Sequence, residues 1–230
     1  MSNAKTDLAR FDADGALAET GAALDGDTRG AFFKKAAIGA GGLAGSSAFL
    51  GGLPALASAA SVPKSDIAIL NFALTLEYLE SEFYKAAVPN INGGTNATLL
   101  AFATTVRDHE LAHVKALQKA LGSKAVKKPT FDFGAAVTDV PTFIKTSFVL
   151  ENTGVHAYLG QAGKIKTPAL LGAAASIVTV EARHAAAIAL LQDATAISGA
   201  GGITPSGAFD TPLSMKAILA AVKKTGFIKG

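Results

Sequence analysis

Apolar residues recur with a helical period over four long stretches of the chain, and this pattern predicts four helices. The stretches cover residues 65–88, 95–121, 141–163 and 167–196. A fifth, shorter stretch of the same kind covers residues 213–224. Apolar residues three to four positions apart line one face of a helix, which must be buried against neighbouring helices. The chain is therefore predicted to be all-α.

Capping residues, glycines and prolines predict where these helices begin and end. Ser65 is predicted as the N-cap of the first helix, and Pro89 with the Gly-Gly pair after it as its stop. Gly122 is expected to end the second helix. Thr167–Pro168 supplies a cap and a first-turn proline for the fourth helix, and Thr211–Pro212 is expected to open the fifth.

The connections between the helices predict their arrangement. Short links join the first helix to the second and the third to the fourth, whereas residues 123–139 have no helical period and are long enough to cross a bundle. Short, long and short connections describe two up-down hairpins joined by a crossover, which is a four-helix bundle. The two halves are interpreted as a divergent internal repeat related by a pseudo-two-fold axis.

Each half of the chain carries the same set of polar residues. The first and third helices have a glutamate followed seven residues later by a tyrosine, and the second and fourth have Glu-x-x-His. These residues are Glu77 and Tyr84, Glu110 and His113, Glu151 and Tyr158, and Glu181 and His184. Residues i and i+3 share a helix face, so each Glu-x-x-His pair can aim both side chains at one point. Bundles hold paired iron or manganese with such a set.

Buried charge favours the same interpretation. An unpaired buried carboxylate is costly, and four converging glutamates repel one another unless they are protonated or bound to cations. Two divalent ions would cancel the four charges, so the six glutamates and histidines predict two Fe or two Mn ions per chain. Tyr84 and Tyr158 lie on the same stripes as their glutamates. They are predicted either to hydrogen-bond a bridging carboxylate across the site or to pack in the core.

Other polar residues in these helices are interpreted differently. Glu82 is rotated by about 140° from Glu77 at 100° per residue and is predicted to be solvated. Glu80 lies on the flank of the Glu77 face and is kept as a substitute ligand. His109 and His156 point away from the ligand faces, so we interpret them as surface residues or neighbours of the site.

The first helix also has a second apolar stripe on the opposite face. It consists of Phe72, Leu76, Leu79 and Phe83. A helix that is apolar on both faces needs a second cover. The fifth helix, the crossover with Phe131 and Phe133, or another subunit could supply it, and a homodimer is among these arrangements.

Composition narrows the chemistry. The chain has no cysteine, which excludes disulfides, thiolate ligands and cysteine nucleophiles and favours iron or manganese over a structural zinc. Half of the residues are hydrophobic, enough to bury a sizeable core. The net charge is only +3, and no basic face with interleaved aromatic residues predicts nucleic-acid binding.

Residues 1–59 are predicted to be a disordered N-terminus that carries an export signal. Basic residues at positions 29, 34 and 35 precede a weakly apolar run rich in glycine and alanine, with small-residue cleavage sites near Ala57 and Ala59. The glycines and serines make this run a poor permanent membrane span. Residues 60–230 are therefore expected to be an exported domain, periplasmic or extracellular, without a stable span. The alternative is a tail that is never cleaved.

The export route is left open by one residue. The segment Thr28–Lys34 resembles a twin-arginine motif, but Gly30 stands in place of its second arginine. Export by the Tat route or by the Sec route is consistent with this segment.

From about Ser65 to Ile228 the chain resembles the ferritin-like domain family, which includes exported bacterial ferritin-like proteins and plant desiccation-related proteins. The segments that carry the resemblance are Leu70–Tyr84, Glu110–His113, Glu151–Gly160, Glu181–His184 and Phe209–Pro212. By similarity to bacterioferritin-type di-iron sites, Glu77 and Glu151 would be terminal ligands and Glu110 and Glu181 bridging ligands. His113 and His184 would supply one imidazole to each metal.

These features predict an exported oxidoreductase whose Fe or Mn ions react with O2 or H2O2, as a ferroxidase or in peroxide removal, with a manganese-catalase-like activity as a variant. Hard oxygen ligands suit Fe and Mn, and carboxylates can shift between terminal and bridging modes. The rival interpretation is a non-catalytic stress or desiccation-related protein that keeps the bundle for structural reasons. Iron storage in a hollow oligomer is a third.

Overall fold

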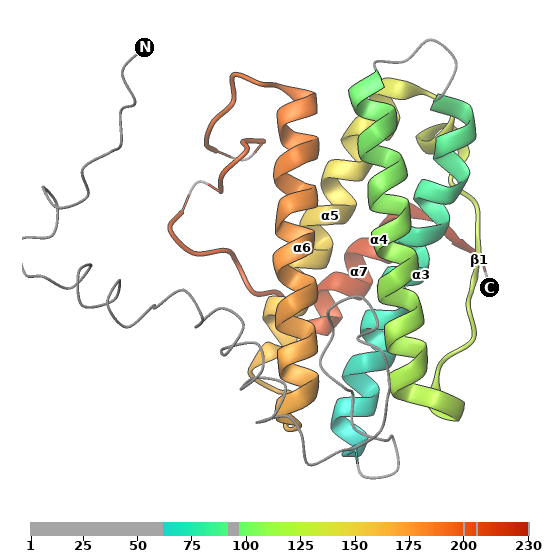
Figure 1. Cartoon of the computed structure of the whole chain (residues 1–230), viewed down its shortest axis with the longest axis vertical. Helices are drawn as coiled ribbons and strands as arrows, with labels where there is room; N and C mark the ends of the chain where they lie inside the picture. Colours follow the sequence, from blue (N-terminus) through green and yellow to red (C-terminus); the bar gives the residue numbers. More distant parts are fainter. Residues whose placement is uncertain (1–61, 92–96, 200, 206, 230) are drawn as a thin grey trace, which may run out of the picture. The chain divides into compact units, whose positions relative to one another are not determined.

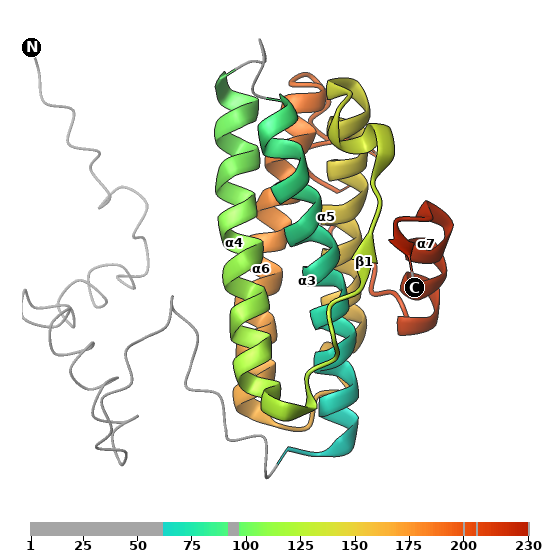
Figure 2. The ribbon, with the colours of Figure 1, turned by 90° about the vertical axis from the view of Figure 1, so that its right-hand side faces the viewer.

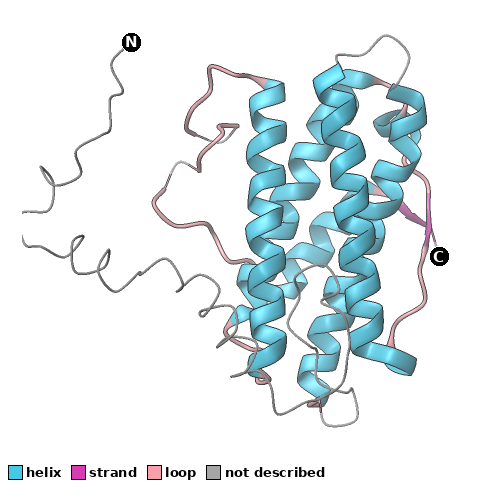
Figure 3. Ribbon diagram, in the orientation of Figure 1, coloured by secondary structure: helices cyan, strands magenta, loops and turns pink. Residues whose placement is uncertain are grey.

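The computed structural model describes residues 62–91, 97–199, 201–205 and 207–229. In this part of the chain five α-helices follow one another (Figures 1 and 3). They are α3 (Lys64–Ile91), α4 (Ala97–Leu121), α5 (Val140–Ala162), α6 (Pro168–Gln192) and α7 (Met215–Thr225). The predicted export signal and its cleavage sites near Ala57 and Ala59 lie outside the described residues.

The four long helices lie side by side as two hairpins, α3 with α4 and α5 with α6 (Figure 2). This confirms the all-α bundle with a short C-terminal helix. The crossover between the hairpins contains only two 3-10 turns, η3 (Gly122–Lys124) and η4 (Gly134–Val137), and the short strand β1 (Thr130–Phe131). The lack of a helical period in this segment therefore corresponds to an extended link.

The second apolar stripe of α3 is covered from within the chain. The rings of Phe83 and Phe133 have centroids 5.6 Å apart, so the crossover packs on this stripe. Ile218 and Val222 of α7 are buried in the same cluster. Figure 2 shows β1 and α7 on the side of the bundle that α3 and α5 form. Of the three covers predicted for this stripe, the structure shows two, the crossover and the fifth helix.

The C-terminal segment is attached to the bundle at two points. The strand β2 (Ile228–Lys229) pairs with β1 in antiparallel register, with Thr130 opposite Lys229. Before α7, the backbone N–H of Leu213 donates to the carbonyl of His156 at 3.1 Å. A Cβ at Gly160 would lie only 1.7 Å from the carbonyl oxygen of Leu213, so α5 needs a glycine there for the two backbones to meet.

Two predicted helix starts differ from the structure. α3 begins at Lys64, and the Ser65 hydroxyl donates to the Asp66 carboxylate instead of capping the helix. α7 begins at Met215, where the Ser214 side chain accepts a hydrogen bond from the backbone of Ala217. Its start is later than predicted because Leu213 is held against α5 in a non-helical conformation.

Two predicted helix ends differ as well. α3 continues through Pro89 to Ile91, because a proline in the last turn removes a single backbone hydrogen bond. α6 ends at Gln192 instead of near Ala196, since Asp193 adopts an extended backbone conformation and its carboxylate accepts a hydrogen bond from the backbone of Thr195.

A buried aspartate joins the first and last helices of the bundle. The Asp66 carboxylate accepts hydrogen bonds from the backbone N–H groups of Lys166, at 3.1 and 3.2 Å, and Thr167, at 2.9 Å. Burial raises the pKa of this carboxyl, but its hydrogen bonds outweigh that effect and lower the pKa. The start of α3 is thereby tied to the turn that precedes α6.

Among the described helices, α6 alone has the length and apolar composition that would allow it to cross a membrane. Helices packed inside bundles meet the same criteria, so this is weak evidence for a span. Its buried face carries Glu181 and His184.

Candidate metal centre

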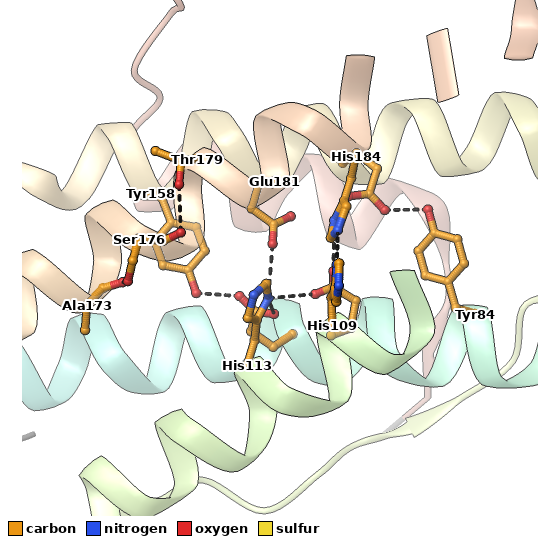
Figure 4. Close-up of polar contacts among 12 residues, drawn as sticks. Tyr84, His109, His113, Tyr158, Ala173, Ser176, Thr179, Glu181 and His184 are labelled. Carbon is orange, nitrogen blue, oxygen red and sulfur yellow. Dashed lines mark hydrogen bonds and ion pairs between the residues drawn. The ribbon is translucent and has the colours of Figure 1, made fainter. Parts of the chain in front are cut away.

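Six of the predicted residues meet in the middle of the bundle. Each of the four long helices contributes one buried glutamate to this set, and α4 and α6 each add a histidine one turn later. The residues are Glu77, Glu110, His113, Glu151, Glu181 and His184. The four carboxylates are fully buried, and the histidines are 8% and 5% exposed. Figure 4 shows His113 and Glu181 facing each other across the bundle.

These side chains form two overlapping groups. The first consists of Glu77, Glu110, Glu181 and His113, and the second of Glu110, Glu151, Glu181 and His184. In each group, one donor atom from every residue lies within 4.8 Å of the others. Glu110 and Glu181 belong to both groups, whereas Glu77 and Glu151 belong to one each. Two neighbouring cations that share two carboxylates would need this arrangement.

The ring of His113 directs its Nδ1 atom into the first group. This nitrogen lies 3.2 Å from Glu77 Oε2 and 3.3 Å from Glu110 Oε2. It also lies 3.2 Å from Glu181 Oε1, which comes from the other hairpin. His113 thus faces carboxylates from three helices with a single ring nitrogen.

The ring of His184 faces the second group in the same way. Its Nδ1 atom lies 3.1 Å from Glu110 Oε1 and 3.1 Å from Glu151 Oε2. Its other nitrogen, Nε2, lies 2.9 Å from Nδ1 of His109, and the two rings stack with centroids 5.2 Å apart (Figure 4). His109 is exposed and comes from α4.

The contact between His109 and His184 could not be found from the sequence pattern. Within α4, His109 points away from the Glu110 face, as predicted. It reaches the site only because α4 and α6 lie next to each other. His156 is not in either donor group; its backbone carbonyl accepts the hydrogen bond from Leu213 instead.

Both tyrosines connect one hairpin to the other. The phenol of Tyr84 donates a hydrogen bond to Glu151, and the phenol of Tyr158 donates one to Glu77. The sequence predicts contact with a bridging carboxylate, but each phenol meets a glutamate that belongs to a single donor group. Seven residues span about 10 Å of helix, so each tyrosine lies beyond the centre and reaches the outer carboxylate of the opposite hairpin.

A fifth glutamate is buried beside these donors. Glu80 of α3 is 3% exposed. Burial raises the pKa of this carboxyl well above its usual range, and the nearby Glu181 and Glu151 carboxylates raise it further. Glu82, by contrast, forms ion pairs with Lys128 at 2.6 Å and Lys85 at 3.5 Å outside the site, close to the solvated position predicted for it.

In the absence of cations the centre retains protons. Burial raises the pKa of Glu77 to about 7. Burial opposes a charged His184, but its contacts with Glu110 and Glu151 raise the pKa of that imidazole to about 10. Burial also opposes a charged Glu110, but contacts with His113 and His184 lower the pKa of its carboxyl. Cations that bind here would replace protons on several of these groups.

The donor set fits metal ions chemically. Oε2 of Glu181 is buried and has no hydrogen bond or ion pair within the described residues. Such an oxygen is costly to bury unless a cation or a proton is next to it. Carboxylate oxygens with one imidazole in each group are ligands that iron and manganese accept. The buried glutamates and histidines are therefore compatible with a metal-binding site.

A bundle of four long helices with buried carboxylates and imidazoles at its centre is typical of the ferritin-like class of proteins. The family model described as "Ferritin-like domain" matches residues 65–194, more than half of the chain. The chain belongs to the ferritin-like domain family, as its sequence motifs indicate. The matched region contains all six donors. A comparison with curated proteins gives no match.

Proposed function

We propose that this protein is exported, binds two Fe or two Mn ions, and uses them in redox chemistry with O2 or H2O2. The observation that carries the proposal is the pair of overlapping donor groups, in which Glu110 and Glu181 belong to both. Metals held by such a set supply two-electron redox chemistry toward dioxygen or peroxide.

The residues of the chain have distinct parts in this function. Glu110 and Glu181 would hold both ions and so keep them close together. Tyr84 and Tyr158 orient the outer carboxylates Glu151 and Glu77 by hydrogen bonds. His113 and His184 would give each ion one nitrogen ligand, and the buried apolar clusters of the bundle would limit the access of water.

Export is part of the proposal and rests on residues 1–59. Export is supported by the order of features in this segment, in which basic residues come first, an apolar run follows, and small-residue cleavage sites come last. The intact mass of the protein isolated from its export compartment tests this part, because cleavage near Ala57 or Ala59 would leave the bundle domain without its N-terminal segment.

A non-catalytic structural protein is the second candidate. The ion pairs that His113 and His184 form with the glutamates favour it, because they balance part of the buried charge without a metal. In that case metal would raise the melting temperature without turnover of O2 or H2O2.

The experiment that tests the proposal compares the metal content of the processed wild-type protein with that of a Glu110→Ala/His113→Ala variant. We expect about two Fe or Mn ions per wild-type chain and a clear loss in the variant. An Asp108→Ala variant is the control, since Asp108 is an exposed acid on the same helix. Oxygen and peroxide consumption by the loaded protein would then separate an enzyme from a structural protein. Absence of metal, with no uptake on anaerobic reconstitution, would contradict the proposal.

A further inference from the structure

Each of the four long helices has two buried positions, three residues apart, at the level of the centre. On α4 and α6 these are a glutamate and a histidine; on α3 they are two glutamates, and on α5 a glutamate and a glycine. The positions are Glu77 and Glu80, Glu110 and His113, Glu151 and Gly154, and Glu181 and His184. Seven of these eight positions thus carry a possible donor, and the eighth has no side chain. Among these positions, the two halves of the chain differ at one corresponding pair, where α3 has Glu80 and α5 has Gly154.

Glu80 is buried without a partner. It is 3% exposed, and it has no hydrogen bond or ion pair within the described residues. Glu82, two residues along the same helix, is paired with two lysines. A glutamate is almost never buried unless it is paired or bound to a cation. Ion pairs with lysines account for the position of Glu82, but no such pair accounts for the burial of Glu80.

Gly154 allows two carboxylates to come close to the backbone of α5. A Cβ at this position would lie 2.9 Å from Oε2 of Glu181 and 3.5 Å from Oε1 of Glu80. That Glu181 oxygen is the buried atom without a hydrogen bond or ion pair. Two carboxylate oxygens therefore approach the same glycine from α3 and α6, and no basic side chain of the described residues is paired with either of these two oxygens.

The place of Glu80 along α3 indicates which half of the centre it serves. It lies between Glu77, which belongs to the first donor group, and Tyr84, whose phenol donates to Glu151 of the second group. Glu80 is thus displaced from Glu77 toward the end of the site that Glu151 occupies. It is not a member of either donor group, so it could bind an ion only if its side chain turned inward.

We propose that Glu80, whose Oε1 already lies beside Gly154, is a seventh ligand, and that its side chain turns inward to bind the metal ion held by Glu151 and His184. This inference rests on the proposed metal binding and makes the two metal positions different. With Glu80 the centre has five carboxylates, one more negative charge than two divalent ions can balance. The additional charge favours a trivalent ion at that position.

The test is a titration of the metal-free protein with Mn(II), in which the electron paramagnetic resonance signal reports free Mn(II). The variants are Glu80→Gln and, as a control, Glu82→Gln, which removes the same charge from the same helix outside the site. We expect Glu80→Gln to weaken one of the two Mn(II) ions by about tenfold or more and to leave the other within about twofold. Glu82→Gln is expected to change neither.

A crystal structure of the Mn-loaded wild-type protein provides the second readout, with a Glu80 oxygen expected at coordination distance from one ion. Unchanged binding in Glu80→Gln, or a loaded structure in which Glu80 points away from both ions, would overturn the inference while the proposed function stands. Equal weakening of both ions would also overturn it, because it would indicate general damage to the bundle. A wild-type protein that binds no Mn(II) and no Fe(II) would instead overturn the proposed function and the inference together.

Discussion

Both histidines of the centre direct Nδ1 toward buried carboxylates, but the neighbours of their outer ring nitrogens differ. Nε2 of His184 meets His109, which precedes His113 by four residues. The residue four positions before His184 is Val180, which cannot form a hydrogen bond with its side chain. A hydrogen bond to the outer ring nitrogen determines which nitrogen faces the metal and in what orientation. At the residue scale, the repeat is therefore only approximate.

Replacing His109 by valine tests this difference. His109→Val puts the residue of the other half-repeat at this position and removes the partner of His184 Nε2. We expect the ion next to His184 to bind about 10- to 100-fold more weakly, and the ion next to His113 to keep its affinity. Calorimetric titration with Mn(II) measures both affinities, and Asp108→Asn serves as the exposed neighbouring control. Two unchanged affinities would show that His109 does not position His184.

At the scale of the elements, the arrangement of α7 depends on one small residue of α5. Leu213 can donate its backbone hydrogen bond to His156 only because Gly160 has no side chain. α7 then packs Ile218 and Val222 on the cluster that contains Phe83. Gly160 of α5 therefore helps to determine how α7 covers the second apolar stripe of α3.

A matched pair of glycine variants follows from this contact. Gly160→Ala would place a Cβ 1.7 Å from the Leu213 carbonyl oxygen, whereas a Cβ at Gly163 would have no atom within 4 Å. We expect Gly160→Ala to lower the free energy of unfolding by about 1–3 kcal/mol and to speed amide exchange in α7. Gly163→Ala is expected to be neutral or slightly stabilising. Urea unfolding and hydrogen exchange check both; unchanged exchange in α7 of Gly160→Ala would contradict the prediction.

At the scale of the whole molecule, the buried centre makes metal-free folding dependent on pH. Burial raises the pKa of Glu77 from 4.5 to about 7, and neighbouring carboxylates raise that of His184 from 6.5 to about 10. The pKa values of Glu80, Glu151 and Glu181 are raised as well. Between the pKa values of these groups in the unfolded chain and their raised values in the folded protein, the folded protein binds more protons than the unfolded chain. The free energy of unfolding therefore decreases as the pH rises through this range.

The melting temperature of the metal-free protein should therefore fall between about pH 5 and about pH 9. Metal should reverse this trend, because deprotonation at higher pH exposes ligands for the ions. Thermal unfolding with a chelator and with excess Mn(II), at several pH values, measures both effects. The Glu110→Ala/His113→Ala variant should show little stabilisation by metal. A metal-free protein that becomes more stable with rising pH would contradict this account of the buried charges.

Local sequence pattern was sufficient to predict the elements and the six residues that meet in the middle of the bundle. The period of apolar residues depends on the geometry of a single helix, so the four long helices could be predicted, with errors confined to their ends. The i, i+3 spacing of Glu110 with His113, and of Glu181 with His184, is also a property of one helix. These six residues could be predicted together because burying several unpaired glutamates in one core is costly, and a single shared site accounts for all of them.

Only the tertiary structure decided which residues from different helices meet. Tyr84 reaches Glu151, His109 stacks on His184, and Glu80 approaches Gly154, and each pair joins separate helices. Such contacts depend on how far neighbouring helices are rotated and shifted relative to each other, and helical periodicity carries no information on either. The sequence by itself therefore determined the helices and their polar faces, while packing determined the partners, because only packing brings distant parts of the chain together.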